Sequence, residues 1–200
     1  MKLNDRQTDA LAELINIAFS RAASSLSQIT GHRVLVEVPK LSVHPMDELS
    51  TILEGLMGVD IATVHQIFTG SVSGDAFLVL NADGAKTLSH LLTDQQTRGK
   101  KLDTSAREVL TEVGNILLNA CLGTFGNMLQ MRIQFSVPRL HVHELGDMLT
   151  SLVIGKEEMR YALVIATQFK VRDSEVSGYL VIVLSVSSLD LLIKEIGKLG

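Results

Sequence analysis

The sequence predicts a mixed α/β sandwich, made of two pseudo-symmetric tandem repeats whose helices pack on a shared β-sheet. Three observations support this prediction. Short patterns recur about 100 residues apart, each copy begins with a long amphipathic helix, and stretches of alternating apolar residues follow in both. A chain of 200 residues is long enough to build one compact domain from two such copies.

The repeat consists of matches that keep one order along the chain. Residues 112–116 (EVGNI) follow residues 13–17 (ELINI) by 99 positions. Further matches join Pro39 to Pro138, Leu41 to Leu140, Val43 to Val142, His44 to His143, and 73–80 to 177–184. Because such an ordered series rarely arises by chance, we predict a single domain of two repeats, at about 5–93 and 104–200, joined by a polar linker at 94–103.

Both copies are expected to contain the same order of elements. The predicted elements are long helices at 5–30 and 104–129, strands at 33–44 and 132–143, short helices at 46–55 and 144–153, strands at 59–68, 76–80, 160–169 and 178–186, and closing helices at 82–92 and 188–199.

Composition limits the possible classes of protein. The net charge of −4 argues against a nucleic-acid binder, which normally carries a basic face. The one cysteine, Cys121, cannot form an intramolecular disulfide and suits a reducing compartment. The N-terminus lacks a signal-peptide pattern, and the apolar stretch at 179–184 is too short to span a bilayer. We therefore expect a cytoplasmic protein that contacts neither nucleic acid nor membrane.

One narrow face of each long helix carries acids and small polar side chains. At about 100° per residue, the members of each set fall within roughly 60° of arc. These two sets, here called the polar lines, are Asp9, Glu13, Asn16 and Ser20 in the first copy, and Glu108, Glu112, Asn115 and Asn119 in the second. The opposite faces carry Leu11, Leu14, Ile15, Ala18, Ala22, Leu26 and Ile29, and Leu110, Val113, Leu117, Cys121, Phe125 and Met128. We expect the apolar faces to pack on the sheet and the polar lines to face outward.

The polar lines have an ordinary explanation and a functional one. Any surface helix carries acids and amides on its wet face. However, Asn is a poor helix former, and here it recurs at the same place in both copies. A carboxamide can donate and accept hydrogen bonds at once, which suits holding a water molecule in line with a phosphorus atom. An acid one turn earlier can pair with a lysine of a partner, so the pair indicates a protein substrate that brings its own phosphoryl group and metal.

The polar lines also match a motif of a known family. That motif reads Asp or Ser, three residues, Glu, two residues, Asn, and then Pro after 22 more residues. The first copy fits it at Asp9, Glu13, Asn16 and Pro39, and the second at Glu112, Asn115 and Pro138, with Glu108 in place of Asp or Ser. In these positions and in its two-copy layout, nearly the whole chain resembles the CheC/CheX/FliY family of chemotaxis phosphatases.

The resemblance implies an enzyme that hydrolyses the aspartyl phosphate of a CheY-type response regulator. It implies that Asn16 and Asn115 orient the attacking water and that Glu13 and Glu112 contact the active-site lysine of the regulator. Asp9 and Glu108 would be further substrate contacts, with no cofactor of the protein's own, since the regulator supplies Mg²⁺. CheC-type members also bind the receptor deamidase CheD, a second implied partner. Because the duplication lets one chain supply two sites, we expect a monomer.

Each copy departs from the family pattern at one place. Glu108 replaces Asp or Ser in the second motif, and Ile15 replaces the usual Gly in the first. Bulk at Phe19 or Arg21, which follow the first motif, is expected to narrow the access of a regulator. Which copy is more active stays open. Two other functions also stay open: a binding module that engages CheD or the regulator without hydrolysis, and a structural part of the flagellar switch.

His141, His143 and Cys121 are the other side chains whose chemistry could matter. His141 and His143 are two positions apart on a predicted strand and so share a face, but no third metal ligand is evident, and we expect no metal site. Cys121 falls on the apolar side of its helix and is expected to be a buried small side chain, not a nucleophile.

Overall fold

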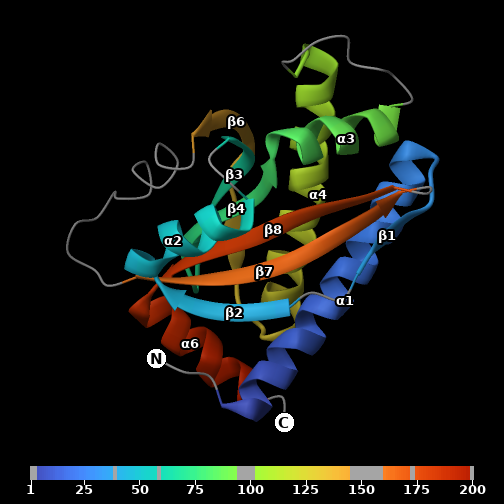
Figure 1. The fold of residues 1–200 in the computed structure, drawn as a ribbon. Coiled ribbons are helices and arrows are strands. Elements are labelled where there is room, and N and C mark those ends of the chain that lie inside the picture. Colours follow the sequence, from blue (N-terminus) through green and yellow to red (C-terminus); the bar gives the residue numbers. More distant parts are fainter. Residues whose placement is uncertain are drawn as a thin grey trace.

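A single antiparallel sheet organises the fold, and helices pack on both of its faces (Figure 1). This computed structural model describes residues 4–37, 40–57, 60–93, 102–144, 160–171 and 174–198. Within them, the helices are α1 (Asp5–Thr30), α2 (Met46–Met57), α3 (Ala82–Thr93), α4 (Thr104–Met128) and α6 (Val186–Ile196). The strands are β1 (Val34–Val36), β2 (Lys40–Pro45), β3 (Asp60–Gly70), β4 (Gly74–Asn81), β5 (Ile133–Phe135), β6 (Arg139–Glu144), β7 (Arg160–Val171) and β8 (Ser174–Ser185). The predicted mixed α/β class, with helices on a shared sheet, is confirmed.

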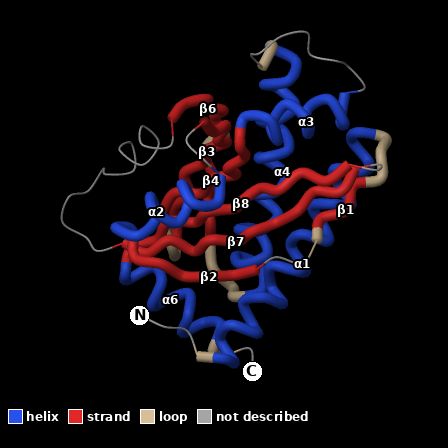
Figure 2. Tube along the Cα trace, in the orientation of Figure 1, coloured by secondary structure: helices blue, strands red, loops and turns tan. Residues whose placement is uncertain are grey.

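The strand order shows that the two halves of the chain exchange strands. The sheet runs β1-β7-β8-β4-β3-β5, with β2 also on β7 and β6 also on β3. The hairpins β3–β4 and β7–β8 meet at the centre through pairing of β4 with β8 (Figure 2). The first two strands of each half lie beside the hairpin of the other half. Each half therefore completes the sheet of the other, and the halves share one core. The predicted linker at 94–103 and the predicted helix at 144–153 lie largely outside the described residues.

The strands predicted at 33–44 and 132–143 are each broken in two, so the prediction of continuous strands was wrong. In the second half, β5 ends at Phe135 and β6 begins at Arg139, yet their partner residues on β3 are one residue closer together. An extra residue must bulge out, and Pro138 in this interval has no N–H to donate to the sheet. The first half has the same excess between β1 and β2 against β7.

The helices divide unequally between the two faces of the sheet. Apolar side chains from α1, α3, α4 and α6 form one large core with the strands, while Leu49 and Leu53 of α2 form a smaller core on the other face. In Figure 1, α2 lies on the opposite side of β7 and β8 from α1 and α4. The two long helices are therefore neighbours on one face, where they also pack against each other.

Local capping fixes where the long helices begin and end. At the start of α1, Asn4 Oδ1 accepts from Gln7 N–H and Gln7 Oε1 accepts from Asn4 N–H, both at 2.9 Å. This reciprocal pair satisfies two amide groups that lack helical partners. Gly31 ends the helix with a left-handed φ of 69°. At the start of α4, Asp103 Oδ1 accepts from Ala106 N–H at 2.8 Å.

The predicted apolar faces are buried except in the last turn of each helix. Ile29 is 62% exposed and Met128 is 38% exposed, so these two assignments were wrong. Both residues lie in the last turn of their helices, and Leu129, directly after α4, is buried again. Phe19, which the sequence did not place on the apolar face, is 2% exposed.

Among the helices that the structure describes, one is long and apolar enough to cross a membrane. This helix is α4, which qualifies by length and composition alone, whereas the sequence analysis considered only the stretch at 179–184 and found it too short. Half of the apolar stretch of α4 is buried inside the fold. Its apolarity is thus of the kind expected for a core helix that packs on a sheet.

Candidate functional site

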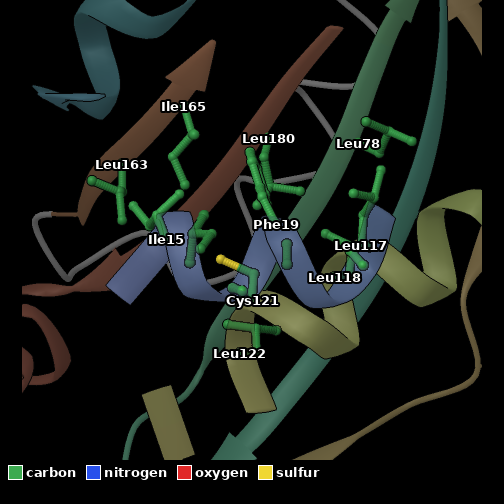
Figure 3. Close-up of a cluster of buried hydrophobic side chains, with 14 of the residues drawn as sticks. Ile15, Phe19, Leu78, Leu117, Leu118, Cys121, Leu122, Leu163, Ile165 and Leu180 are labelled. Carbon is green, nitrogen blue, oxygen red and sulfur yellow. The ribbon is translucent and has the colours of Figure 1, made fainter. Parts of the chain in front are cut away.

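The polar lines lie on two helices whose buried faces are directed at the sheet and at each other. Figure 3 shows Ile15 and Phe19 of α1 beside Cys121 and Leu122 of α4, with Leu180 of β8 next to them. All of these side chains belong to the large core. Because the apolar faces are used in this packing, the opposite faces, which carry the acids, are left towards solvent.

The first polar line combines exposed acids with a half-buried amide. Asp9 and Glu13 are exposed, and neither makes an ion pair with another described residue. Asn16 is half-buried, and its Oδ1 is buried without a hydrogen-bond partner among the described residues. The expectation that the whole polar line faces outward was therefore wrong for the Asn16 amide. A buried carbonyl oxygen without a hydrogen-bond partner lowers the stability of the fold. Its presence is therefore a reason to look for a function of this amide.

In the second polar line the two acids and the motif amide are exposed to the same degree as in the first, but here the amide accepts a hydrogen bond. Glu108 and Glu112 are exposed and Asn115 is half-buried. Here Asn119, one turn later, donates from Nδ2 to Asn115 Oδ1 at 2.7 Å. This bond fixes the orientation of the Asn115 amide. The equivalent residue of the first copy, Ser20, is exposed.

The structure thus places the six predicted site residues in two groups of three, one on each long helix. Pro39 lies outside the described residues, and Pro138 is half-buried between β5 and β6. The roles assigned to these residues stay predictions, since their arrangement alone does not show a reaction.

A groove beside the second polar line contains residues that the sequence did not single out. It is open, has a volume of about 580 Å³, and lies between α4 and β6. Its lining residues are Thr104, Arg107, Glu108, Thr111, Glu112, Arg139, Leu140 and His141. The β6 residues reach α4 only because β6 pairs with β3 of the other half, and no local sequence pattern reports that pairing.

The glycine that distinguishes the second copy sits against the sheet. A Cβ atom on Gly114 would lie 2.5 Å from Val64 Cβ on β3, far inside van der Waals contact. Gly114 therefore allows α4 to approach β3 closely. In the first copy, Ile15 occupies the equivalent place and is completely buried.

The expectations for Cys121 and Phe19 can be compared with their burial. Cys121 is buried in the large core, and burial raises the pKa of its thiol to about 12, so it is an uncharged core side chain, as predicted. The expectation that Phe19 narrows access to the first motif was wrong, because its side chain points into the core. Arg21 is exposed.

A histidine cluster lies on the face of the sheet that carries α2. His65 Nε2 lies 2.9 Å from Asp75 Oδ1, its ring stacks on Phe77, and His141 lies 6.4 Å away between ring centroids. Among the described residues, no group of three or more His, Cys, Asp or Glu side chains could hold a metal ion. The side chain of His143 is not among those described.

Comparison with known proteins supports one family. A sequence model of the CheC-like family matches residues 7–43, which include the first polar line. The CheY-P phosphatase CheC of Bacillus subtilis is 23% identical over 171 residues, which cover 82% of this chain and 80% of that protein. The chain is thus similar to proteins of the CheC-like family.

Solved structures show the same fold as this chain. FliY of Thermotoga maritima superimposes with a TM-score of 0.78 at 19% identity, with all of both chains covered. A CheX–CheY–BeF3–Mg²⁺ complex from Borrelia burgdorferi matches with a TM-score of 0.51 at 15% identity, over 84% of this chain and 96% of the other. At these identities the structures establish the fold alone. The resemblance to the CheC/CheX/FliY family stated from the sequence is confirmed.

Proposed function

We propose that this CheC-like protein is a phosphatase that hydrolyses the aspartyl phosphate of a CheY-type response regulator. One observation carries the proposal: the same pairing of an exposed Glu with a half-buried Asn, three residues later, on the outer face of both long helices. The pairs are Glu13 with Asn16 and Glu112 with Asn115. The name of the Bacillus subtilis relative, a CheY-P phosphatase, supports the same reaction.

The reaction is transfer of a phosphoryl group from a carboxylate to water. The water oxygen bonds to phosphorus while the bond between phosphorus and the carboxylate oxygen breaks. The products are the free aspartate of the regulator and inorganic phosphate, which carries both protons of the water. The amides of Asn16 and Asn115 would hold the water in line with the breaking bond, which is a contribution of position and not of proton transfer.

The carboxylates of the polar lines have a different part in the proposal. Glu13 and Glu112 are exposed and reach outward one turn before the amides, so each can pair with a lysine at the phosphorylated site of the regulator. Asp9 and Glu108 extend the same contact by one more turn. Mg²⁺ would come with the regulator, and CheX of the Borrelia burgdorferi complex is related in fold to this chain and binds CheY with BeF3 and Mg²⁺.

The decisive experiment follows the decay of a phosphorylated CheY-type regulator with and without the protein. We expect the wild type to accelerate decay and the Asn16→Ala/Asn115→Ala variant to lose about 100-fold of that acceleration, since misplacing a reactant typically has such an effect. The single variants rank the two copies. Circular dichroism of each variant serves as the folding control. Full acceleration by the double variant would exclude the amides from the mechanism.

A second candidate is a binding module that engages the regulator or the deamidase CheD without hydrolysis. The departures from the family motif favour it, since Ile15 replaces Gly in one copy and Glu108 replaces Asp or Ser in the other. In this case the wild type would bind the beryllofluoride form of the regulator and leave the rate of phosphate loss unchanged.

A further inference from the structure

A cleft with a volume of about 520 Å³ lies on the face of the sheet that carries α2, away from the polar lines. This cleft, here called the α2 cleft, is bounded by β2, β7, β8 and the C-terminal half of α2. Its volume is in the range of small-molecule sites in proteins, roughly 300 to 1,000 Å³. The function proposed above uses the other face of the sheet, so the α2 cleft has no part in it.

Part of the α2 cleft is apolar. Ile52 and Leu56 of α2 line it, and Leu56 is 51% exposed. Val164 of β7 belongs to the smaller core beside α2, so Ala166, two residues later, lies on the same face of the sheet. An apolar ligand in the cleft would cover this surface, which is favourable because it removes apolar area from water.

The polar side chains of the α2 cleft lack partners. By strand register, Lys40 and Tyr179 flank Ala166 on the neighbouring strands, and Gln168 and Ser177 form the next pair on the same face. Within the described residues, none of these four polar side chains makes a hydrogen bond or an ion pair. They offer an ammonium group, two hydroxyls and an amide, all of which can donate. Such a set of donors suits an anion, and a carboxylate above all.

The acid that lines the α2 cleft already has a cation beside it. Lys170 Nζ lies 2.8 Å from Glu37 Oε1 and 2.6 Å from Glu175 Oε1. Lys40 has no such partner in the part of the chain that the structure describes. A ligand carboxylate can therefore pair with Lys40 without displacing an existing ion pair.

The other half of the sheet carries larger side chains at the equivalent place. At the offset of 99 residues Lys40 corresponds to Arg139, which pairs with His65 on β3 as Lys40 pairs with Ala166 on β7. His65 in turn pairs with Phe77, and the two rings stack with 4.4 Å between their centroids. A histidine ring thus stands where the first half of β2 faces only the methyl group of Ala166. The small size of Ala166 is what leaves the α2 cleft open.

We propose that the α2 cleft binds a small organic carboxylate with an apolar or aromatic body. The carboxylate pairs with Lys40, and the body lies over Val164 and Ala166 beside Leu56. This site is separate from the polar lines, so the proposal does not depend on the phosphatase activity.

The test uses 4-phenylbutyrate as the probe and 4-phenylbutylamine as the matched ligand of opposite charge. NMR signals of the methyl groups of Val164 and Ala166 report binding without any regulator. We expect 4-phenylbutyrate to bind with a Kd on the order of 1 mM, as for a ligand of about twelve non-hydrogen atoms, and the amine to bind at least about tenfold more weakly. Lys40→Met should reduce this preference to less than about threefold, because it removes the charge and keeps an apolar stem.

Filling the α2 cleft tests its place in the fold. Ala166→His introduces the residue that stands at the equivalent place of the other half, and Ser177→Leu fills the cleft from an exposed position of β8. Each variant that keeps the circular dichroism of the wild type should bind 4-phenylbutyrate at least about tenfold more weakly. Arg139→Ala is the matched control in the other half and should leave the affinity unchanged. Equal affinity for the acid and the amine, unchanged affinity in the filled variants, or no methyl shift at about 10 mM probe would each overturn the proposal.

Discussion

The helices α1 and α4 are two versions of one element within the same molecule. Each starts at a side-chain cap, buries one apolar face, and exposes two acids beside a half-buried Asn. They differ in what surrounds that Asn: Asn119 holds Asn115, whereas Asn16 Oδ1 has no partner among the described residues. They also differ beneath it, where Ile15 fills the core and Gly114 lets β3 approach. The scaffold is thus shared, and the support of the amide is better defined in the second copy.

The largest effect is expected from emptying the space under the first amide. Ile15 is completely buried, so Ile15→Ala should lower the free energy of unfolding by about 2 to 5 kcal/mol, through lost burial and the cavity left behind. Urea unfolding followed by circular dichroism measures it. A loss below about 1 kcal/mol would show that the site collapses and that the two helices do not differ in this way.

Adding a side chain at the equivalent position of the second copy should lower the free energy of unfolding by a smaller amount. Gly114→Ala places a methyl group against Val64 on β3, so α4 must move or Val64 must shift. We expect a loss of about 1 to 3 kcal/mol, reduced by the better helix propensity of Ala. The double variant Gly114→Ala/Val64→Ala should recover part of it in the same urea experiment. Stabilisation by Gly114→Ala alone would contradict the close approach.

The hydrogen bond between the two amides is expected to show in catalysis. In the Asn16→Ala background, Asn119→Ser copies the residue of the first helix, Ser20, and should lower kcat about threefold to tenfold with little change in KM, as expected for one lost neutral hydrogen bond. The matched gain is Ser20→Asn in the Asn115→Ala background, which should raise kcat. Phosphate-loss kinetics measure both. Equal kcat for Asn119→Ser and its parent would remove Asn119 from the positioning of Asn115.

The parts of this comparison that depend on local patterns could be predicted from the sequence. The spacing of apolar side chains acts within one helix, so the approximate extents of α1 and α4 and most of their buried residues followed from it. The polar lines were predicted for the same reason. Ile29 and Met128 were misplaced because a periodic pattern does not show which turns of a helix are covered by other elements.

The parts that depend on the other half of the chain could not be predicted. An alternating pattern tells which side of a strand is buried but not which strand is its neighbour. The exchange of strands between halves, the breaks before Lys40 and Arg139, and the presence of Arg139 in the groove beside α4 all follow from that unknown pairing. The hydrogen bond from Asn119 to Asn115 could not be predicted either. The first copy has Ser20 at the position of Asn119, so the repeat gave no sign of a bond there.

The smallest expected effect on stability comes from a buried position at which the two helices carry different residues. Cys121 of α4 corresponds to Ala22 of α1, and both are buried. Burial raises the pKa of the thiol from 9.0 to about 12 in the folded protein. Above pH 9 the unfolded chain therefore loses this proton while the folded chain keeps it, so the free energy of unfolding falls as pH rises towards 12.

Cys121→Ala, which copies the first helix, removes this dependence and serves as the matched control. We expect the wild type to lose about 1 kcal/mol more than Cys121→Ala between pH 8 and about pH 10, because only the wild type has a thiol that ionises on unfolding. Urea unfolding at the two pH values measures this difference, and titration of lysines and tyrosines cancels between the two proteins. Parallel losses would mean that the thiol ionises in the folded protein, and hence that α4 opens at Cys121 more readily than its burial in the core implies.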